Sequence, residues 1–210
     1  MERELQRTGW FAFAAVPSWS SKSSVDTERA RYIAAGLQLE LGHLDDAERR
    51  IATLEQSYRT HPDDSYLWRA WLETYKARIA RLRGQLPKAE SLARAALAAL
   101  QERHATPVYL VGTTRELAKC LIDEHRYEEA RPFVEQTRKL VTASHGTGDE
   151  VAWVDLMSAE IEAGIGHRDA ARAQAEQVRD VLENYPGEIE ARKRVAALLA
   201  RTASKTTRSK

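Results

Sequence analysis

Histidine, cysteine and paired acidic residues are the side chains of this sequence whose types suit metal binding or catalysis. Three of the six histidines, His43, His125 and His167, stand in the same short pattern, which recurs along the chain. We expect them to lie about one repeat or more apart, too far to share an ion at the roughly 2 Å ligand distances of zinc. The pattern therefore predicts turn residues rather than a metal site.

The paired acids and the single thiol also have structural explanations. Asp45–Asp46 and Glu128–Glu129 fall at predicted helix starts, where the helix dipole favours negative charge. Cys120 shares a column of the repeat with leucine and isoleucine, so we expect a buried, inert thiol. The sequence contains no P-loop, GxGxxG or GxSxG motif. We therefore expect a protein that is not an enzyme and that needs no cofactor or metal.

One short pattern occurs four times and organises the chain: GHLDDA at 42–47, GQLPKA at 84–89, HRYEEA at 125–130 and GHRDAA at 166–171. The closing alanines are 42, 41 and 41 residues apart, and another alanine lies twelve residues before each of them. Self-similarity at a period of 20–50 residues is typical of stacked repeat proteins. Such proteins present extended binding surfaces, so the repeat favours binding over chemistry.

The predicted fold class is all-α. Stretches rich in alanine, leucine, glutamate and arginine have high helix propensity, and no alternating run of β-branched residues indicates a strand. Each repeat divides into two helices. In the first repeat these cover about 26–41, with Asp26 as a plausible N-cap and Gly42 in a left-handed turn, and then about 45–58.

The same division predicts four helical hairpins and a capping helix. The expected solenoid covers residues 25–201, with repeats at about 26–63, 64–105, 106–147 and 148–186 and a cap at 187–201. Residues 202–210 are predicted to form a disordered basic tail. Residues 1–24 form an aromatic N-terminal segment and linker, whose Trp10 and Phe13 would cap the first hairpin. The alternative is that the segment anchors the chain to a partner or a membrane surface.

Composition limits the class of partner and the compartment. Charged residues make up 30% of the chain but balance to a net charge of +1, so we expect no nucleic-acid binding. A single cysteine and the lack of an apolar run long enough for a membrane span predict a cytoplasmic protein. Residues 148–186 are acidic and 187–210 are basic, which would suit a homo-oligomer as well as it suits a solvated surface.

A family resemblance rests on residues 117–140, LAKCLIDEHRYEEARPFVEQTRKL. A small residue, a short turn with an aromatic, a second small residue and an amphipathic helix resemble a tetratricopeptide repeat (TPR). The period is longer than the common 34 residues and is similar to the long variant of kinesin light chains. Similar arrays occur in regulatory arms of bacterial transcription activators and Ser/Thr kinases. The resemblance implies a right-handed α–α superhelix that serves as an adaptor, scaffold or sensor arm.

The resemblance also implies where a ligand would bind, because the concave groove of this family is lined by the first helix of each repeat. The corresponding residues that we select as candidates for partner binding are Tyr32, Trp71, Arg78, Arg81, Arg115, Lys119 and Trp153. Guanidinium groups form paired hydrogen bonds to carboxylates, so a basic groove would suit a protein partner or an acidic peptide. The alternative is that these arginines form a solvated helix face.

The sequence thus predicts a non-enzymatic protein–protein interaction module that binds a peptide or protein in its groove. A second hypothesis is a regulatory or sensor arm of a bacterial signalling or transcription pathway. A third is nucleic-acid binding through the basic groove and residues 192–194, which the balanced charge disfavours.

Overall fold

The computed structural model describes residues 22–59 and 66–203. The described residues form nine helices and no strand, which confirms the predicted all-α class. The predictions for the aromatic N-terminal segment, for Trp10 and Phe13, and for the tail beyond residue 203 lie outside the described residues. The helices are α2 (Lys22–Leu41), α3 (Leu44–Arg59), α4 (Tyr66–Leu82), α5 (Leu86–Glu102), α6 (Pro107–Asp123), α7 (Tyr127–Ala143), α8 (Gly148–Gly164), α9 (Arg168–Leu182) and α10 (Ile189–Thr202).

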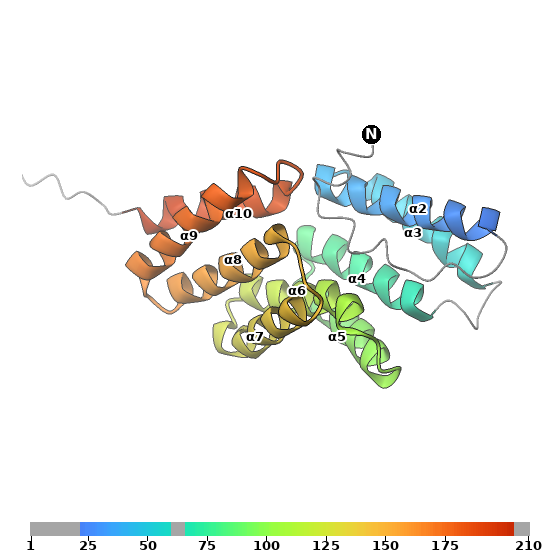
Figure 1. The fold of residues 1–210 in the computed structure, drawn as a ribbon, viewed down its shortest axis with the longest axis horizontal. Coiled ribbons are helices and arrows are strands. Elements are labelled where there is room, and N and C mark those ends of the chain that lie inside the picture. Colours follow the sequence, from blue (N-terminus) through green and yellow to red (C-terminus); the bar gives the residue numbers. More distant parts are fainter. Residues whose placement is uncertain (1–21, 60–65, 204–210) are drawn as a thin grey trace, which may run out of the picture.

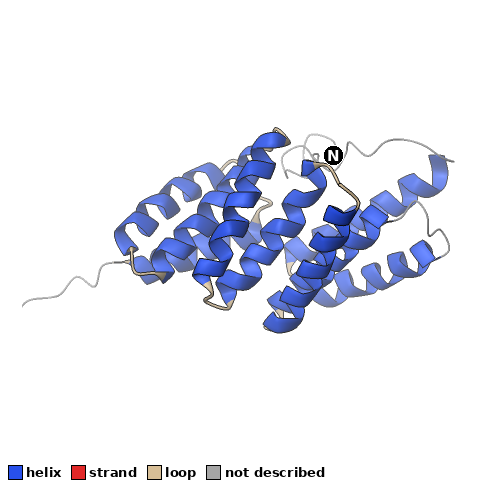
Figure 2. Ribbon diagram, turned by 90° about the horizontal axis from the view of Figure 1, so that it is seen from below, coloured by secondary structure: helices blue, strands red, loops and turns tan. Residues whose placement is uncertain are grey.

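Consecutive helices pair into four hairpins, α2–α3, α4–α5, α6–α7 and α8–α9, and α10 follows alone (Figure 1). The first helices α4, α6 and α8 contact one another directly, and α10 continues this row beyond α8. The second helices contact the hairpin that follows them, so α5 packs on α6 and α7 on α8. Figure 2 shows the paired helices from below. The first helices therefore build an inner row.

The last described helix contacts the first. Helix α10 contacts α2, although more than a hundred residues separate them in sequence. Figure 1 shows these two helices next to each other along one side of the molecule. The two helices at the ends of the inner row, α2 and α10, are therefore in contact with each other.

The repeated turn has one backbone geometry in all four copies. Gly42, Gly84 and Gly166 have φ values of 79°, 75° and 102°, and His125 has 60° in the equivalent place. In the first copy His43 N donates to Gln38 O at 2.9 Å and Gly42 N donates to Leu39 O at 3.1 Å. The same two bonds recur in the other three turns, which is the Schellman arrangement that ends a helix at a left-handed residue. The predicted left-handed turn at Gly42 is confirmed.

The alanine columns lie where the helices of each hairpin cross. All eight alanines are 0% exposed: Ala35, Ala77, Ala118 and Ala159 in the first helices, and Ala47, Ala89, Ala130 and Ala171 in the second. A turn of two or three residues brings the two helix axes close together, and only a small side chain fits between them. Larger residues of both helices, among them Leu117, Leu121 and Val134, pack around the alanines of the third hairpin.

The first helix differs from its predicted bounds. Helix α2 begins at Lys22, so Asp26 lies inside the helix and is not its N-cap. No glycine or proline interrupts the chain between residues 18 and 35, so nothing stops the helix from extending backward by one turn. At the other end α10 continues to Thr202, whose hydroxyl donates to Leu198 O at 2.9 Å within the buried side of the helix.

Replacing Ala130 with leucine tests the crossing. The larger side chain has no space between α6 and α7, so we expect a loss of about 1–3 kcal/mol in the free energy of unfolding. Urea denaturation followed by circular dichroism measures it. Ala95→Leu, on an exposed face of α5, is the matched control and should change stability by less than about 0.5 kcal/mol. Equal effects of the two substitutions would contradict the tight crossing.

Candidate functional site

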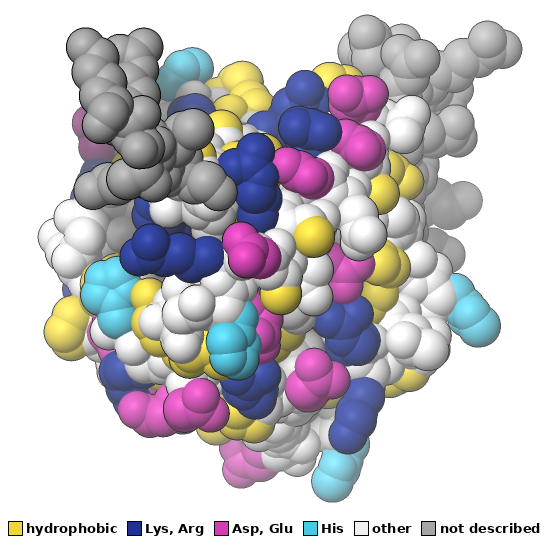
Figure 3. All heavy atoms as spheres, turned by 90° about the vertical axis from the view of Figure 1, so that its left-hand side faces the viewer, with side chains coloured by type: hydrophobic (Ala, Val, Ile, Leu, Met, Phe, Trp, Pro, Cys, Tyr) yellow, Lys and Arg dark blue, Asp and Glu magenta, His cyan; other side chains and the backbone are white. Residues whose placement is uncertain are grey.

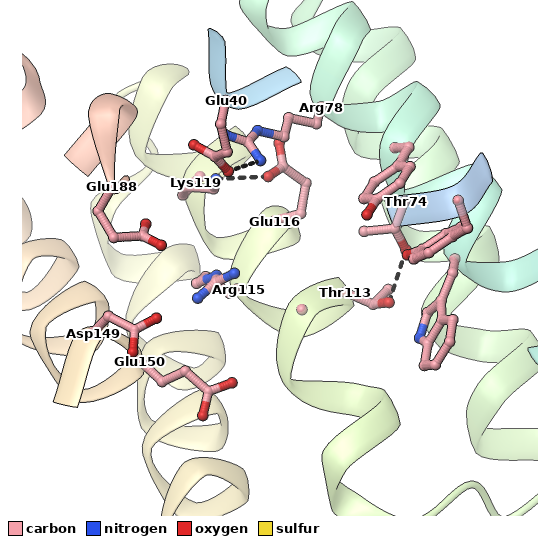
Figure 4. A pocket seen from close by; sticks show the side chains of 14 residues that line it. Glu40, Thr74, Arg78, Thr113, Arg115, Glu116, Lys119, Asp149, Glu150 and Glu188 are labelled. Atoms are coloured by element: carbon pink, nitrogen blue, oxygen red, sulfur yellow. Dashed lines mark hydrogen bonds and ion pairs between the residues drawn. The ribbon is translucent and has the colours of Figure 1, made fainter. Parts of the chain in front are cut away.

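The first helices of the hairpins and the segment before α10 surround a pocket of about 720 Å³, counting the part open to solvent. We call it the central pocket (Figure 4). It is lined by Tyr32 and Glu40 of α2, Trp71, Thr74, Tyr75 and Arg78 of α4, Gly112, Thr113, Arg115, Glu116 and Lys119 of α6, Asp149 and Glu150 of α8, and Glu188.

Helical spacing places these residues together. On α4, Trp71, Tyr75 and Arg78 are three or four residues apart, so they share one face of the helix. On α6, Arg115 and Lys119 follow the same spacing. The aromatic side of the pocket is compact: the rings of Tyr32 and Tyr75 are stacked with centroids 4.6 Å apart.

Buried charges in the wall of the pocket and beyond it form what we call the central ion-pair network. Its members are Arg78, Arg81, Lys119 and Arg194, with Glu40, Glu116, Asp123, Glu160 and Glu190. The side chain of Arg81 is 2% exposed and that of Lys119 is 3% exposed. Arg81 Nε lies 2.5 Å from Glu116 Oε1, and Arg81 Nη2 lies 2.5 Å from Glu190 Oε1. Every cation of the network is therefore matched by carboxylates.

Glu190 pairs with three cations of this network. Its Oε2 lies 2.7 Å from Arg78 Nη2, and its Oε1 lies 3.4 Å from Lys119 Nζ, in addition to the contact with Arg81. Glu190 is in the first turn of α10, whereas its three partners are on α4 and α6. One carboxylate of the last helix thus joins the second and third hairpins.

Two carboxyl groups of the network, those of Glu116 and Glu190, have lowered pKa values. Burial raises the pKa of Glu116, but the charges of Arg81 and Lys119 outweigh burial and lower the pKa from 4.5 to about 2. For Glu190, burial is likewise outweighed by Arg81, Lys119 and Arg78, which hold its pKa well below the ordinary value. Burial lowers the pKa of Lys119, and Glu116 and Glu190 offset only part of this effect.

All seven residues predicted for partner binding come together in this region. Tyr32, Trp71, Arg78, Arg115 and Lys119 line the pocket. Arg78 and Lys119 also belong to the network, and Arg81 belongs to the network only. The indole of Trp153 lies under two cations, with Lys119 Nζ 4.6 Å and Arg115 Cζ 5.5 Å from the ring centroid. Its N–H donates to Glu188 Oε2 at 2.7 Å. Their role in binding a partner stays a prediction.

The basic groove itself is different from either sequence-based interpretation. Arg78, Arg81 and Lys119 are neither an open patch for an acidic peptide nor a solvated face, because carboxylates of the same chain already pair with them and bury them. Glu40, Glu116 and Glu190 were missed as site residues. Glu116 carried a local signal, since it lies three residues before Lys119 on the same helix face. Glu190 carried none, because its partners are 71 to 112 residues away in the sequence.

Arg115 is the cation of the pocket that lacks such a partner. It forms no ion pair with any carboxylate of the described residues, and its Cζ lies 5.5 Å from the centroid of the Trp153 ring. Figure 4 shows Glu188, Asp149 and Glu150 on one side of Arg115, and Thr113 and Thr74 on the other. The two threonine hydroxyls hydrogen-bond to each other at 2.8 Å.

Two buried carboxylate oxygens at the pocket have no hydrogen-bond donor, Asp149 Oδ1 and Glu40 Oε2. Asp149 is 4% exposed and makes no ion pair with the described residues. Glu150, its neighbour, is engaged, since its Oε2 accepts a hydrogen bond from Thr147 N at 3.1 Å. Burial first, and then the charge of Glu40, raise the pKa of Glu188. The pocket therefore contains two carboxylate oxygens that the described residues leave without a donor.

Other sites weighed from the sequence are accounted for within residues 22–59 and 66–203. No cluster of three or more histidine, cysteine or acidic side chains there is arranged to hold a metal ion. Cys120 is buried, and burial raises the pKa of its thiol. No helix in this part of the chain has the length and apolarity to cross a membrane. On the outside, the face in Figure 3 mixes basic and acidic side chains. The basic α10 residue Arg194 pairs with Glu160 of α8 within the same chain.

A scan against models of known protein families and a search of curated proteins found no match to this chain. Any assignment of function therefore rests on the pocket and the network.

Removing Glu190 should destabilise the fold strongly. Glu190→Ala leaves three buried cations without a shared carboxylate, so we expect a loss of about 3–5 kcal/mol in the free energy of unfolding. Urea titration measures the loss. Glu129→Ala, which removes the exposed partner of Arg126, is the control and should cost about 1 kcal/mol or less. A mild effect of Glu190→Ala would mean that solvent screens the network.

The network also predicts acid sensitivity. Because the pKa of Glu116 falls from 4.5 to about 2 on folding, the unfolded chain binds more protons between these pH values. The contribution of Glu116 to the free energy of unfolding should therefore be complete above about pH 5 and decrease as the pH falls toward 2. Urea titrations across this range measure the slope. Glu116→Gln should reduce the slope, and Glu128→Gln, at an exposed carboxyl, should leave it unchanged. Identical slopes for both variants would refute the assignment.

Proposed function

We propose that this protein is a non-enzymatic binding module, related in design to tetratricopeptide repeats, that binds a segment of a peptide or protein partner in the central pocket. Four hairpins with one repeated turn and with small residues at the helix crossings support the likeness in design. The turn, the alanines and the row of first helices are structural features, so they suit a scaffold whose specific residues face inward.

The observation that carries the proposal is the contrast between the two charged regions at the inner row. In the central ion-pair network every cation has a carboxylate within the chain. In the pocket beside it, Arg115 has no ion-pair partner among the described residues, and Asp149 Oδ1 has no donor. Buried polar groups are normally hydrogen-bonded, and a group that is left without a partner invites a ligand that supplies it.

Arg115→Glu tests binding through the pocket. Affinity capture from native lysate, followed by mass spectrometry, compares it with the unchanged chain and with Lys139→Glu, an equal change of charge on an exposed face of α7. If the pocket binds the partner, only Arg115→Glu should change the captured amount, by about tenfold or more, because charge is altered at the buried contact.

Circular dichroism and thermal unfolding establish that each variant is folded, and Arg115→Gln repeats the test with a neutral side chain. A partner captured equally by all of the variants, or one sensitive to Lys139→Glu alone, would place the binding surface elsewhere and overturn the proposal.

A further inference from the structure

The acidic side of the central pocket points to the chemistry of its ligand. After the pairs of the network are set aside, the groups around Arg115 are Asp149 and Glu188, together with the free oxygen of Glu40. Arg115 supplies one positive charge against this excess of carboxylates. Apart from the pairs of the network, the pocket thus holds one cation, Arg115, and an excess of carboxylate oxygens that can accept hydrogen bonds.

Asp149 is the strongest single indication. It is nine-tenths buried, it lines the pocket, and its Oδ1 receives no hydrogen bond. Leaving a buried carboxylate oxygen without a donor costs free energy, which a ligand with N–H donors would recover. Its position as second residue of α8 explains a negative charge there, but the equivalent Asp169 of α9 is exposed and lines no described pocket. The helix dipole alone therefore does not account for its burial.

Glu188, like Asp149, favours a positively charged ligand. Within the described residues the Glu188 side chain accepts one hydrogen bond, from the indole N–H of Trp153. Burial and the neighbouring charges of Glu40 and Asp149 raise the pKa of Glu188, and Arg115 offsets part of this effect. A second cation in the pocket would relieve the repulsion among these three carboxylates.

The opposite side of the pocket is aromatic. Tyr32, Trp71 and Tyr75 line it, with ring centroids of Tyr32 and Trp71 5.5 Å apart. Aromatic faces attract cations and also pack against the aliphatic stem of a basic side chain. An acidic ligand would gain nothing from these rings and would meet the carboxylates opposite.

We infer that the central pocket binds an organic cation, an ammonium or guanidinium group whose N–H groups donate to Asp149, with Glu188 and Glu40 supplying further negative charge. This inference rests on the proposed function, because it names the group that a partner inserts. It reverses the acidic peptide expected from the sequence. The cation comes either from a lysine or arginine side chain of a peptide or from a free polyamine.

Isothermal titration calorimetry at low ionic strength tests the inference with three probes. These are spermidine, a short capped peptide with a central Lys-Lys pair, and the same peptide with Glu-Glu. We expect one or both cationic probes to bind and the acidic peptide not to bind. Binding of the lysine peptide alone identifies a basic segment as the source, and comparable binding of spermidine identifies the polyamine; both results support the inference.

Matched variants locate the binding. Asp149→Asn should weaken cation binding by about tenfold or more, because a charge-assisted hydrogen bond is lost. Asp169→Asn removes the same charge from the same helix position in α9 and should leave affinity unchanged. Arg115→Gln should strengthen binding, since the competing positive charge is gone. This opposite response keeps the test informative if Asp149→Asn does not fold.

Three results would overturn the inference: no cationic probe binds, the Glu-Glu peptide binds and is lost with Arg115→Gln, or Asp149→Asn and Asp169→Asn behave alike. These outcomes are separable from the test of the proposed function. Partner capture that depends on Arg115 without cation binding would leave the binding module intact and refute only the chemistry assigned here. Cation binding without a captured partner would refute the protein partner and retain the site.

Discussion

The buried pairing of Glu190 with Arg78, Arg81 and Lys119 is the interaction on which the arrangement of the inner row depends. Removing each of these charged groups from water costs free energy. This desolvation cost is offset only when the charges pair with good geometry. Helix α10 therefore has one acceptable position relative to α4 and α6. The apolar contacts of Ala191, Val195 and Leu198 hold α10 against α8 and α9, and the charges set its position against the earlier hairpins.

This pairing also decides what the neighbouring pocket can do. Because Glu190 and Glu116 already satisfy the network cations, an incoming carboxylate would have to compete with them inside a buried site. Arg115 stands outside this competition, and it faces acidic groups from α8 and from the segment before α10. The two adjacent regions consequently differ in role, since one holds the hairpins together and the other keeps donors and acceptors unpaired.

The hairpins were predictable from sequence because their causes are local. Every repeat has a left-handed residue in its turn, such as Gly42 or Gly84, and an alanine five residues later. At His125 the turn keeps its shape with a different residue, which the alignment of the four copies still revealed. The predicted site residues also converge, because helical spacing determines which side chains share a face.

The ion pairing of the basic residues at that site was not predictable in the same way. Arg78 and Arg81 resemble a basic patch in the sequence because all of their acidic partners, Glu40, Glu116, Asp123 and Glu190, lie 35 or more residues away. The decisive carboxylate, Glu190, belongs to a helix outside the four repeats, so no comparison among repeat copies contains it. Pairing between elements that are distant in sequence depends on how the whole array curves, which local patterns do not encode.

The contact between α10 and the earlier hairpins has a consequence for how such a chain can change in length. In an open array each unit touches only its neighbours, so units can be added or removed at little expense. Here Glu190 must reach Arg78, 112 residues earlier, while α10 also contacts α2. A duplicated or deleted hairpin would separate these partners and leave several buried charges without an ion-pair partner. The number of hairpins is thus fixed by electrostatics, and the molecule behaves as a closed unit despite being built from copies.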